Sequence, residues 1–371
     1  MTDTILCVDI GTTSLKAAFL PDNLKKKPVF VSRQYFSKKA VSENRVAEEY
    51  LPSLSRAVSE LKEKNPDYAV EAVCVSGNGP TVISDDGTTL LHNQFFENLS
   101  KEKNSALKNT KSLFIPRFSG FKQNFSFSWS ETEHIFGAPE FLLYALTGKA
   151  VSILPEERFL SAYWSEEELE LCGFGKNEIE KLPPFVSSGS FVGKLSEKAA
   201  LETGLFEGTF VFAGSPDFVA ALIGTGTVLP GRLCDRAGSS EGLNLCTSKP
   251  IFAKDLRTMP SPIPGLWNLS YLLRNCENCT DSKDYFSELM RGVELLRQAA
   301  LSNGEFFPDF MTITGGQALN DELIAGKERA TGLKIKKMPT SDAELIGDLI
   351  LARVALGDYD DITEAVFAII G

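Results

Sequence analysis

Histidines and clustered basic residues are scarce in this sequence, which disfavours a histidine-ligated metal site and a nucleic-acid-binding surface. The 371 residues include only two histidines, His92 and His134, and neither lies in a recognisable metal-ligand motif. The formal net charge is −11, and the basic runs at 23–28 and 334–339 are short. Because a phosphate backbone needs clustered lysine and arginine, no nucleic-acid partner is expected.

Long apolar runs are also missing. No stretch has the length of a membrane span, and the first residues, which include Asp3 and Asp9, lack a leader and cleavage pattern. The seven cysteines are odd in number and scattered, with several inside apolar segments. These features predict a reduced chain in the cytoplasm, with no membrane partner.

One cysteine pair, Cys276 and Cys279, has the CxxC spacing of metal and redox sites. A zinc site would need two further ligands, and neither histidine stands in such a motif. The helical context of a redox pair is absent as well. The favoured interpretation is a surface loop with two thiols.

What is present at the start of the chain is a run of strands followed by a helix. Residues 4–10 and 14–20 predict a hairpin, and 29–37 predict a third strand. Apolar residues spaced three and four apart predict an amphipathic helix over 47–64, and a buried strand follows at 69–77. Parallel α/β folds alternate strand and helix from the start, whereas this chain builds antiparallel strands first.

A similar order recurs in the second half of the chain. CDRAGSSEGLNL resembles CVDIGTTSLKAA near the N-terminus, so we expect two α/β lobes of duplicated architecture. Between them, the aromatic-rich segment 118–129 suits stacking on a flat ligand, but packing into a core is the favoured interpretation. The later elements are expected at 209–215 (strand), 216–226 (helix), 231–248 (two strands), 284–302 (helix), 310–316 (strand), from Asn320 (helix), 333–338 (strand) and from Asp342 (helix).

The first turn, DIGTTSLK, carries residues suited to a phosphate and a metal ion. Gly11 permits a tight turn and lets a phosphate approach the backbone. Thr12 and Thr13 offer hydroxyl and N–H donors, and Lys16 suits charge neutralisation. Asp9, at the strand end, is placed to hold Mg²⁺ through water. The alternative is a hairpin turn with solvated polar residues.

Asp217 is the candidate general base. Ser215 suits a helix N-cap and Pro216 the first helical position, which places Asp217 in the first turn. The helix dipole favours an ionised carboxylate there. Phosphoryl transfer through a loose transition state does not require a strong base. The alternative is that Asp217 is merely a good residue for the start of a helix.

Two further glycine turns are ordinary when each is taken alone. The turn at 238–242 has a common turn composition, although a pair of such turns facing each other would clamp a triphosphate. The strand at 310–314 ends in Gly315 and Gly316, which would let a nucleoside pack against bare backbone. In isolation, an ordinary strand-to-helix turn is the favoured interpretation of these glycines.

Taken together and in this order, the segments resemble the FGGY family of carbohydrate kinases, within the superfamily of actin-like proteins, sugar kinases and Hsp70 ATPases. DIGTTSLKAAFL is similar to the family's N-terminus, and VCVSGNGP falls where the family has SGQMHG. FLLYALTG resembles DYLRYRLTG, and VFAGSPDFVAALIGTGTVLPG resembles VAGGHDQQAAALGAGVVEPG. GSSEG stands for the GTSG turn, and TGGQALN for the glycines of the adenosine site.

The resemblance implies a fold, an activity and a set of site residues. It implies an α/β fold of two ribonuclease-H-like (actin-like ATPase) lobes, 1–227 and 228–371, which close about a nucleotide cleft, the second lobe being shortened. It implies phosphorylation of a small-molecule sugar or polyol by ATP and Mg²⁺, with Asp217 as base and Asp9 at the metal site, and leaves a homodimer open. The implied nucleotide-site residues are Gly11, Thr12, Thr13, Lys16, Gly238, Ser239, Ser240, Gly315, Gly316, Gln317 and Asn320, and the implied substrate-site residues are Asn78, Gly79, Pro80, Asn98 and Asp217.

Several departures from the family concern the substrate pocket. The chain is shorter, mostly between Ser248 and Phe310, and SGNGPT lacks the histidine of SGQMHG. FENLS replaces WNDxR, so Asn98 stands where an aspartate is expected and Ser100 where an arginine is expected, which removes a charge-assisted bond to a sugar hydroxyl.

The alternative function is a non-catalytic nucleotide- or sugar-binding regulatory homologue. An actin-like filament protein has no reason to carry Asp217 in this context.

Overall fold

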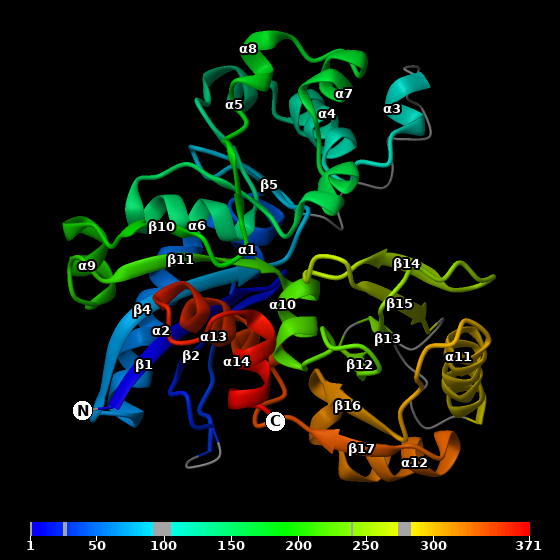
Figure 1. Ribbon diagram of the computed structural model, residues 1–371. Coiled ribbons are helices and arrows are strands. Elements are labelled where there is room, and N and C mark those ends of the chain that lie inside the picture. The colour runs from blue at the N-terminus through cyan, green and yellow to red at the C-terminus, as the bar shows by residue number, and fades with distance from the viewer. Residues whose placement is uncertain (1, 25–27, 92–104, 239, 274–282) are drawn as a thin grey trace. The chain divides into compact units, whose positions relative to one another are not determined.

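The described part of the chain consists of two α/β units (Figure 1). Unit 1 comprises residues 1–22 and 30–218, and unit 2 comprises residues 23–29 and 219–371. The computed structural model describes residues 2–24, 28–91, 105–238, 240–273 and 283–371.

A six-stranded sheet forms the centre of unit 1, with strand order β10-β11-β4-β1-β2-β3. β1, β2 and β3 pair antiparallel, while β4 runs parallel to β1 and β11 runs parallel to β4. The expected hairpin, third strand and buried strand are confirmed. The strands of the sheet are β1 (Thr2–Ile10), β2 (Ser14–Leu20), β3 (Ser32–Tyr35), β4 (Tyr68–Gly77), β10 (Phe191–Lys194) and β11 (Phe210–Pro216), and the larger helices on it are α2 (Tyr50–Lys64), α6 (Ala138–Thr147) and α9 (Glu197–Thr203).

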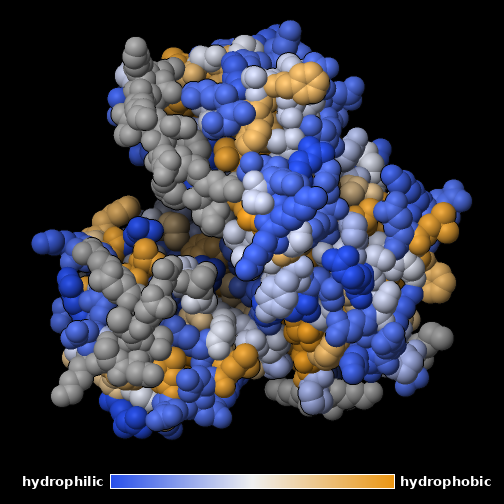
Figure 2. All heavy atoms as spheres, turned by 180° about the vertical axis from the view of Figure 1, so that it is seen from behind, coloured by the Kyte–Doolittle hydropathy of each residue, from blue (hydrophilic) through white to orange (hydrophobic). Residues whose placement is uncertain are grey.

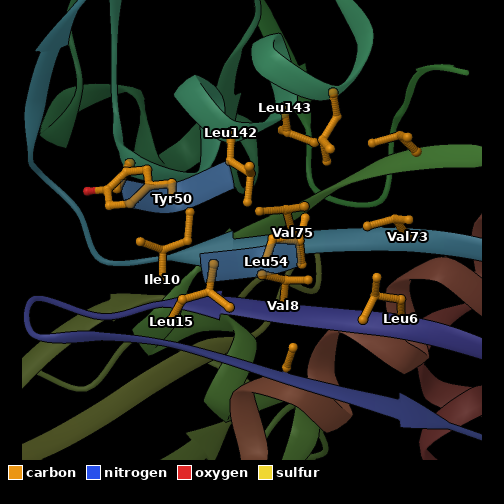
Figure 3. Packing of buried hydrophobic residues seen from close by; sticks show 14 of the residues in the cluster. Leu6, Val8, Ile10, Leu15, Tyr50, Leu54, Val73, Val75, Leu142 and Leu143 are labelled. Atoms are coloured by element: carbon orange, nitrogen blue, oxygen red, sulfur yellow. The ribbon is translucent and has the colours of Figure 1, made fainter. Parts of the chain in front are cut away.

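Helices α2 and α6 pack against one face of this sheet, as Figure 3 shows for part of the core. Side chains alternate between the two faces of a strand. Val8 and Ile10 of β1 therefore enter this core together with Val75 of β4 and Leu142 of α6. Asp9 lies between Val8 and Ile10 in sequence, so its side chain leaves β1 on the other face of the sheet.

Between β4 and β11 the chain forms a set of short helices and strands around a second core. This core is rich in aromatic rings, and Phe118, Phe121 and Trp129 are each buried in it. Packing into a core is thereby confirmed for these rings of the aromatic-rich segment, whereas Phe127 is exposed. The short elements of unit 1 are α1 (Lys38–Ser42), the 3₁₀ turns Val46–Glu49 and Glu157–Ala162, β5 (Val82–Ser84), β6 (Thr89–Leu90), α3 (Ser105–Asn109), α4 (Ile115–Asn124), α5 (Ser126–Glu131), β7 (Ile135–Phe136), β8 (Ser152–Leu154), α7 (Glu166–Leu171), α8 (Lys176–Ile179) and β9 (Phe185–Ser187).

Asp86, in the turn between β5 and β6, gives the stability of the protein a dependence on pH. Burial raises the pKa of its carboxyl, but hydrogen bonds from Ser84, Thr88 and Ser128 lower it more, from the ordinary 3.8 to about 2. A carboxyl whose pKa is lowered by folding stabilises the fold above its ordinary pKa, and this contribution is lost as the pH falls through the folded value.

Asp86→Asn should therefore lower the melting temperature at neutral pH, because the amide cannot accept the same set of hydrogen bonds. The difference in melting temperature from the unchanged protein should shrink as the pH falls from 3.8 to about 2. Thermal unfolding followed by circular dichroism across this range checks the prediction. A difference that stays constant throughout would contradict it.

Unit 2 repeats the plan of unit 1. Its sheet has the strand order β14-β15-β13-β12-β16-β17, in which β12, β13 and β15 pair antiparallel and β16 and β17 continue parallel to β12. Without the edge strand β14, the order β15-β13-β12-β16-β17 corresponds strand by strand to β3-β2-β1-β4-β11 of unit 1. The expected duplication of the architecture is therefore confirmed. The elements are α10 (Asp217–Gly224), β12 (Leu233–Ala237), β13 (Glu241–Thr247), β14 (Arg257–Pro260), β15 (Trp267–Leu272), α11 (Lys283–Ser302), β16 (Phe310–Thr314), the 3₁₀ turn η5 (Gly316–Leu319), α12 (Asp321–Thr331), β17 (Lys334–Lys337), α13 (Ala343–Leu356) and α14 (Ile362–Ile369).

Two glycines allow α10 and α13 to cross with their backbones in contact. A Cβ added at Gly224 would lie 1.9 Å from the carbonyl oxygen of Ala343, and one at Gly347 would lie 2.1 Å from that of Ala220. From Val219 onward α10 accordingly belongs to unit 2. The lobe boundary expected after residue 227 stays a prediction.

Gly347→Ala should destabilise the protein even though alanine is the better helix former. The gain in helix propensity is about 1 kcal/mol at most, whereas forcing a methyl group into a backbone contact costs about 1–3 kcal/mol or more. We expect a net loss of about 2 kcal/mol in the free energy of unfolding, measured by urea denaturation.

The matched control for this prediction is Gly175→Ala, where an added Cβ would meet no atom nearer than 3.9 Å. It should change the free energy of unfolding far less. Equal effects of the two substitutions would show that the helix crossing tolerates a side chain.

The face of the molecule drawn in Figure 2 is mainly hydrophilic, with scattered hydrophobic side chains. Such scattered apolar side chains are normal on the surface of folded proteins. Within the described ranges, none of the helices combines the length and the apolar character needed to cross a membrane.

Candidate active site

The predicted site residues of unit 1 lie at the carboxyl ends of three neighbouring strands or directly after them. β4 lies between β1 and β11, and all three run in the same direction. Ile10 pairs with Gly77, and Gly77 pairs with Pro216, so the three strands end at the same edge. The residues that follow are the first turn after β1, the segment Asn78–Pro80 after β4, and Asp217 after β11.

The first turn is a tight hairpin connection between β1 and β2. The N–H of Gly11 donates to the carbonyl oxygen of Ser14 at 2.9 Å, which leaves Thr12 and Thr13 at the tip. A Cβ at Gly11 would lie only 3.2 Å from that oxygen, so glycine suits this position. Thr13 is exposed and Thr12 half-buried, and their donors are therefore accessible to a ligand.

Asp9 and Lys16 form an ion pair directly across the hairpin, where they are register partners. Lys16 Nζ lies 3.0 Å from Asp9 Oδ2, and the two side chains are 16% and 3% exposed. The other carboxylate oxygen, Asp9 Oδ1, is buried and has no hydrogen-bond partner. A buried carboxylate oxygen without a donor is an acceptor position that a hard cation or its bound water fits.

Asn78, directly after β4, links the ends of β4 and β1 by hydrogen bonds. Its backbone N–H and its side-chain Nδ2 donate to the carbonyl oxygen of Ile10, at 2.7 and 3.2 Å. Its Oδ1 accepts a bond from the hydroxyl of Thr81 at 2.6 Å, and the residue is 4% exposed. The polar atoms of this predicted substrate residue thus already have protein partners, whereas Gly79 is exposed and Pro80 half-buried.

Asp217 is the first residue of α10 and is half-buried. Its Oδ1 accepts the N–H of Phe218 at 2.5 Å, which orients the carboxylate. Pro216 is the last residue of β11, so the helix begins one residue later than expected, because Pro216 still pairs with Gly77. The expected place of Asp217 in the first helical turn is confirmed.

In unit 2, the two predicted glycine turns lie in contact with each other. Gly315 follows β16 with φ +91°, and a Cβ there would lie 2.4 Å from the carbonyl oxygen of Ala237, the last residue of β12. Glycine is therefore required at Gly315. Gly238, Ser240 and Gly316 are exposed, so their backbones are accessible.

Gln317 and Asn320 have partners inside unit 2. Asn320 caps α12 through a bond from the Leu323 N–H to its Oδ1 at 3.0 Å. Gln317 Nε2 donates to Glu241 Oε2 at 2.6 Å. Glu241 belongs to a buried cluster with Asp235 and Lys327 that was not predicted from the sequence.

Asn98, Ser239 and the Cys276/Cys279 pair, which were singled out in the sequence, fall outside the described residues. Among the residues that the structure describes, no group of three or more histidine, cysteine, aspartate or glutamate side chains is arranged to hold a metal ion. A cation at Asp9 would thus rely on one carboxylate together with water and phosphate oxygens, which is the usual coordination of Mg²⁺ beside a nucleotide.

Two sheets of matching strand order, each with antiparallel strands first and parallel strands after, define an α/β fold of two ribonuclease-H-like lobes. This is the actin-like ATPase fold that the resemblance implied, and the solved structures with this fold include sugar and polyol kinases.

Xylulose kinase from Lactobacillus acidophilus has a TM-score of 0.73 at 15% identity, with 99% of this chain and 92% of that chain covered. Glycerol kinase from Plasmodium falciparum, solved with ADP, has a TM-score of 0.71 at 13% identity and the same coverage of 99% and 92%. At these identities the likeness is one of fold. The resemblance to the FGGY carbohydrate kinases is thereby confirmed in the fold, while the shortening of the second lobe stays a prediction.

No protein-family model matches the chain. Among curated proteins, the autoinducer-2 kinase of Yersinia enterocolitica is 30% identical over 105 residues. This match spans 28% of the present chain and 19% of that protein.

Proposed function

We propose that this protein is an ATP-dependent carbohydrate kinase, which transfers the γ-phosphoryl group of ATP to a hydroxyl of a sugar or polyol. The observation that carries the proposal is that Asp9 and Asp217 lie at the same edge of the unit 1 sheet, at the ends of β1 and β11, which are separated only by β4. Two strand spacings amount to about 10 Å. That separation leaves room for an acceptor hydroxyl and a phosphoryl group between the two carboxylates.

Asp217 is the proposed general base. Its carboxylate, oriented by the Phe218 N–H, would accept the proton of the acceptor hydroxyl as the oxygen attacks the γ-phosphorus. The new oxygen–phosphorus bond forms while the bond to the ADP oxygen breaks, and the proton stays on Asp217. The transition state is loose, so positioning of the hydroxyl contributes more than base strength.

The first turn is proposed to hold the phosphates. The N–H and hydroxyl groups of Thr12 and Thr13 are accessible donors, and Gly11 brings the backbone close. Lys16 contributes positive charge beside Asp9, whose unpartnered Oδ1 fits the Mg²⁺ site. When bound, Mg²⁺ supplies charge that stabilises the β- and γ-phosphate oxygens.

The remaining predicted contacts keep narrower roles in this proposal. Gly79 and Pro80 are the proposed substrate contacts beside Asp217, while Asn78 fixes the end of β1 through Ile10. Asn98 keeps its proposed place in the substrate pocket. The nucleotide contacts proposed in unit 2 are Gly238, Ser239, Ser240, Gly315 and Gly316, with Gln317 and Asn320 supporting them.

The test is ADP release by the purified protein with Mg·ATP, measured by a coupled assay against a panel of ketoses, aldoses and polyols. A kinase should release ADP faster in the presence of at least one member of the panel than in its absence. Nucleotide binding without stimulation by any panel member would instead favour a regulatory homologue and contradict the proposal.

A further inference from the structure

A buried cluster of charged side chains lies behind the two glycine turns of unit 2. Lys327 of α12 is 0% exposed and contacts Asp235 Oδ2 of β12 and, at 3.0 Å, Glu241 Oε1 of β13. The hydroxyl of Tyr285, from α11, lies 2.8 Å from the same Glu241 oxygen. Gln317 Nε2 donates to the second oxygen, Oε2, at 2.6 Å.

Stability alone does not account for such a cluster. Moving charges from water into a protein interior costs several kcal/mol for each ion, and well-packed apolar residues often stabilise as much. Burial lowers the pKa of Lys327, but Asp235 and Glu241 raise it more, so the ammonium stays charged. The lysine therefore holds both carboxylates in fixed positions.

Glu241 stands at the point where the cluster meets both turns. It directly follows Ser240, in the glycine turn after β12. Its partner Gln317 directly follows Gly316, in the glycine turn after β16. On the backbone side, the two turns already touch where Gly315 packs on Ala237. The Glu241–Gln317 bond joins them a second time through side chains.

We propose that Glu241 is a positioning residue that fixes the two glycine turns of unit 2 relative to each other, so that their backbone donors are preorganised for a nucleotide. This inference rests on the proposed kinase function and extends it from the turns to the side chains behind them. A preorganised site does not pay an ordering cost when its ligand binds. Loosening the bond should therefore weaken nucleotide binding without altering the sugar site of unit 1.

The test uses Glu241→Gln and Gln317→Met in the full chain. Glu241→Gln keeps the size of the side chain but leaves one acceptor oxygen for three donors. Gln317→Met removes the Glu241–Gln317 bond and the bond that Gln317 Oε1 accepts from the Tyr285 hydroxyl, while Glu241 keeps Lys327 and Tyr285 as partners. The matched control is Glu288→Gln, because Glu288 also accepts a tyrosine hydroxyl, that of Tyr271, within the same unit.

We expect both variants to raise the KM for ATP and the Kd for Mg·ADP, measured by calorimetry, about tenfold, since a hydrogen bond to a charged group is lost. The KM for the sugar should change less than about twofold, and Glu288→Gln should behave as the unchanged protein. If Glu241→Gln does not fold, Gln317→Met carries the test, because it leaves no buried charge unpaired.

Two results would overturn the inference. Folded variants with unchanged KM for ATP and Kd for Mg·ADP would show that the Glu241–Gln317 bond does not position the two glycine turns. An equal rise in the KM for ATP and for the sugar would show a general structural defect instead. Failure of the kinase proposal itself is recognised separately, because the unchanged protein would then show no ADP release stimulated by a sugar or polyol. If the unchanged protein also bound no Mg·ADP, the inference would fall with the proposal.

Discussion

Replacing Asp217 by asparagine should reduce sugar-dependent ADP release about 10²- to 10⁴-fold, the usual contribution of a general base. The amide is nearly isosteric, and its oxygen can still accept the Phe218 N–H that orients the side chain. The substitution should therefore leave the Kd for Mg·ADP and the melting temperature close to those of the unchanged protein. The loss should appear in kcat rather than in the KM for ATP.

The matched control is Asp361→Asn, because Asp361 is another aspartate at a helix start, where it accepts the Glu364 N–H. Asparagine caps helices about as well as aspartate does, so this variant should keep full activity. Retention of sugar-dependent turnover in Asp217→Asn would remove the base from the proposed mechanism. A similar loss in both variants would point to a general effect of carboxylate removal.

Replacing Lys327 by methionine should destabilise the fold by about 3–5 kcal/mol, the cost of removing one partner from a buried charge pair. The methionine fills similar space but leaves Asp235 and Glu241 buried without a counter-charge. The measurement is the free energy of unfolding from urea denaturation. The control, Lys337→Met, removes an ion pair with Asp321 whose side chains are 46% and 87% exposed, and should cost less than about 1 kcal/mol.

The destabilisation by Lys327→Met should depend on pH. Burial raises the pKa of Asp235 and Lys327 lowers it, so removing the lysine raises the pKa further. A carboxyl with a raised pKa binds its proton more tightly in the folded state, so stability falls as the pH rises through that value. The variant should therefore recover stability relative to the unchanged protein as the pH is lowered from mildly alkaline to mildly acidic. A deficit that does not change with pH would contradict this account of the cluster.

The strands of the unit 1 site were predictable from local sequence patterns, but their order in the sheet was not. Strand periodicity located β1, β4 and β11. The parallel pairing of these three strands, which brings Asp9 and Asp217 to one edge of the sheet, depends on long-range contacts that no local pattern specifies. The turn chemistry of Gly11, in contrast, was legible from the sequence.

The charge cluster of unit 2 could not be predicted in the same way. Lys327 lies 92 residues from Asp235 and 86 from Glu241, so the contacts depend on the packing of α12 against the sheet. The available signal was a charged residue, Asp235, inside an otherwise buried strand. The role of Asn78 was also hidden, because its bonds to Ile10 and Thr81 arise only when β1 and β4 pair.

The most direct test of the central claim is to detect the phosphorylated product itself. The purified protein is incubated with Mg·ATP and the sugar or polyol that most stimulates ADP release, and the products are quantified by mass spectrometry. The account predicts one sugar or polyol phosphate for each ADP formed, and neither product above background with Asp217→Asn. ADP formed without phosphorylated acceptor, or formed equally by the variant, would contradict it.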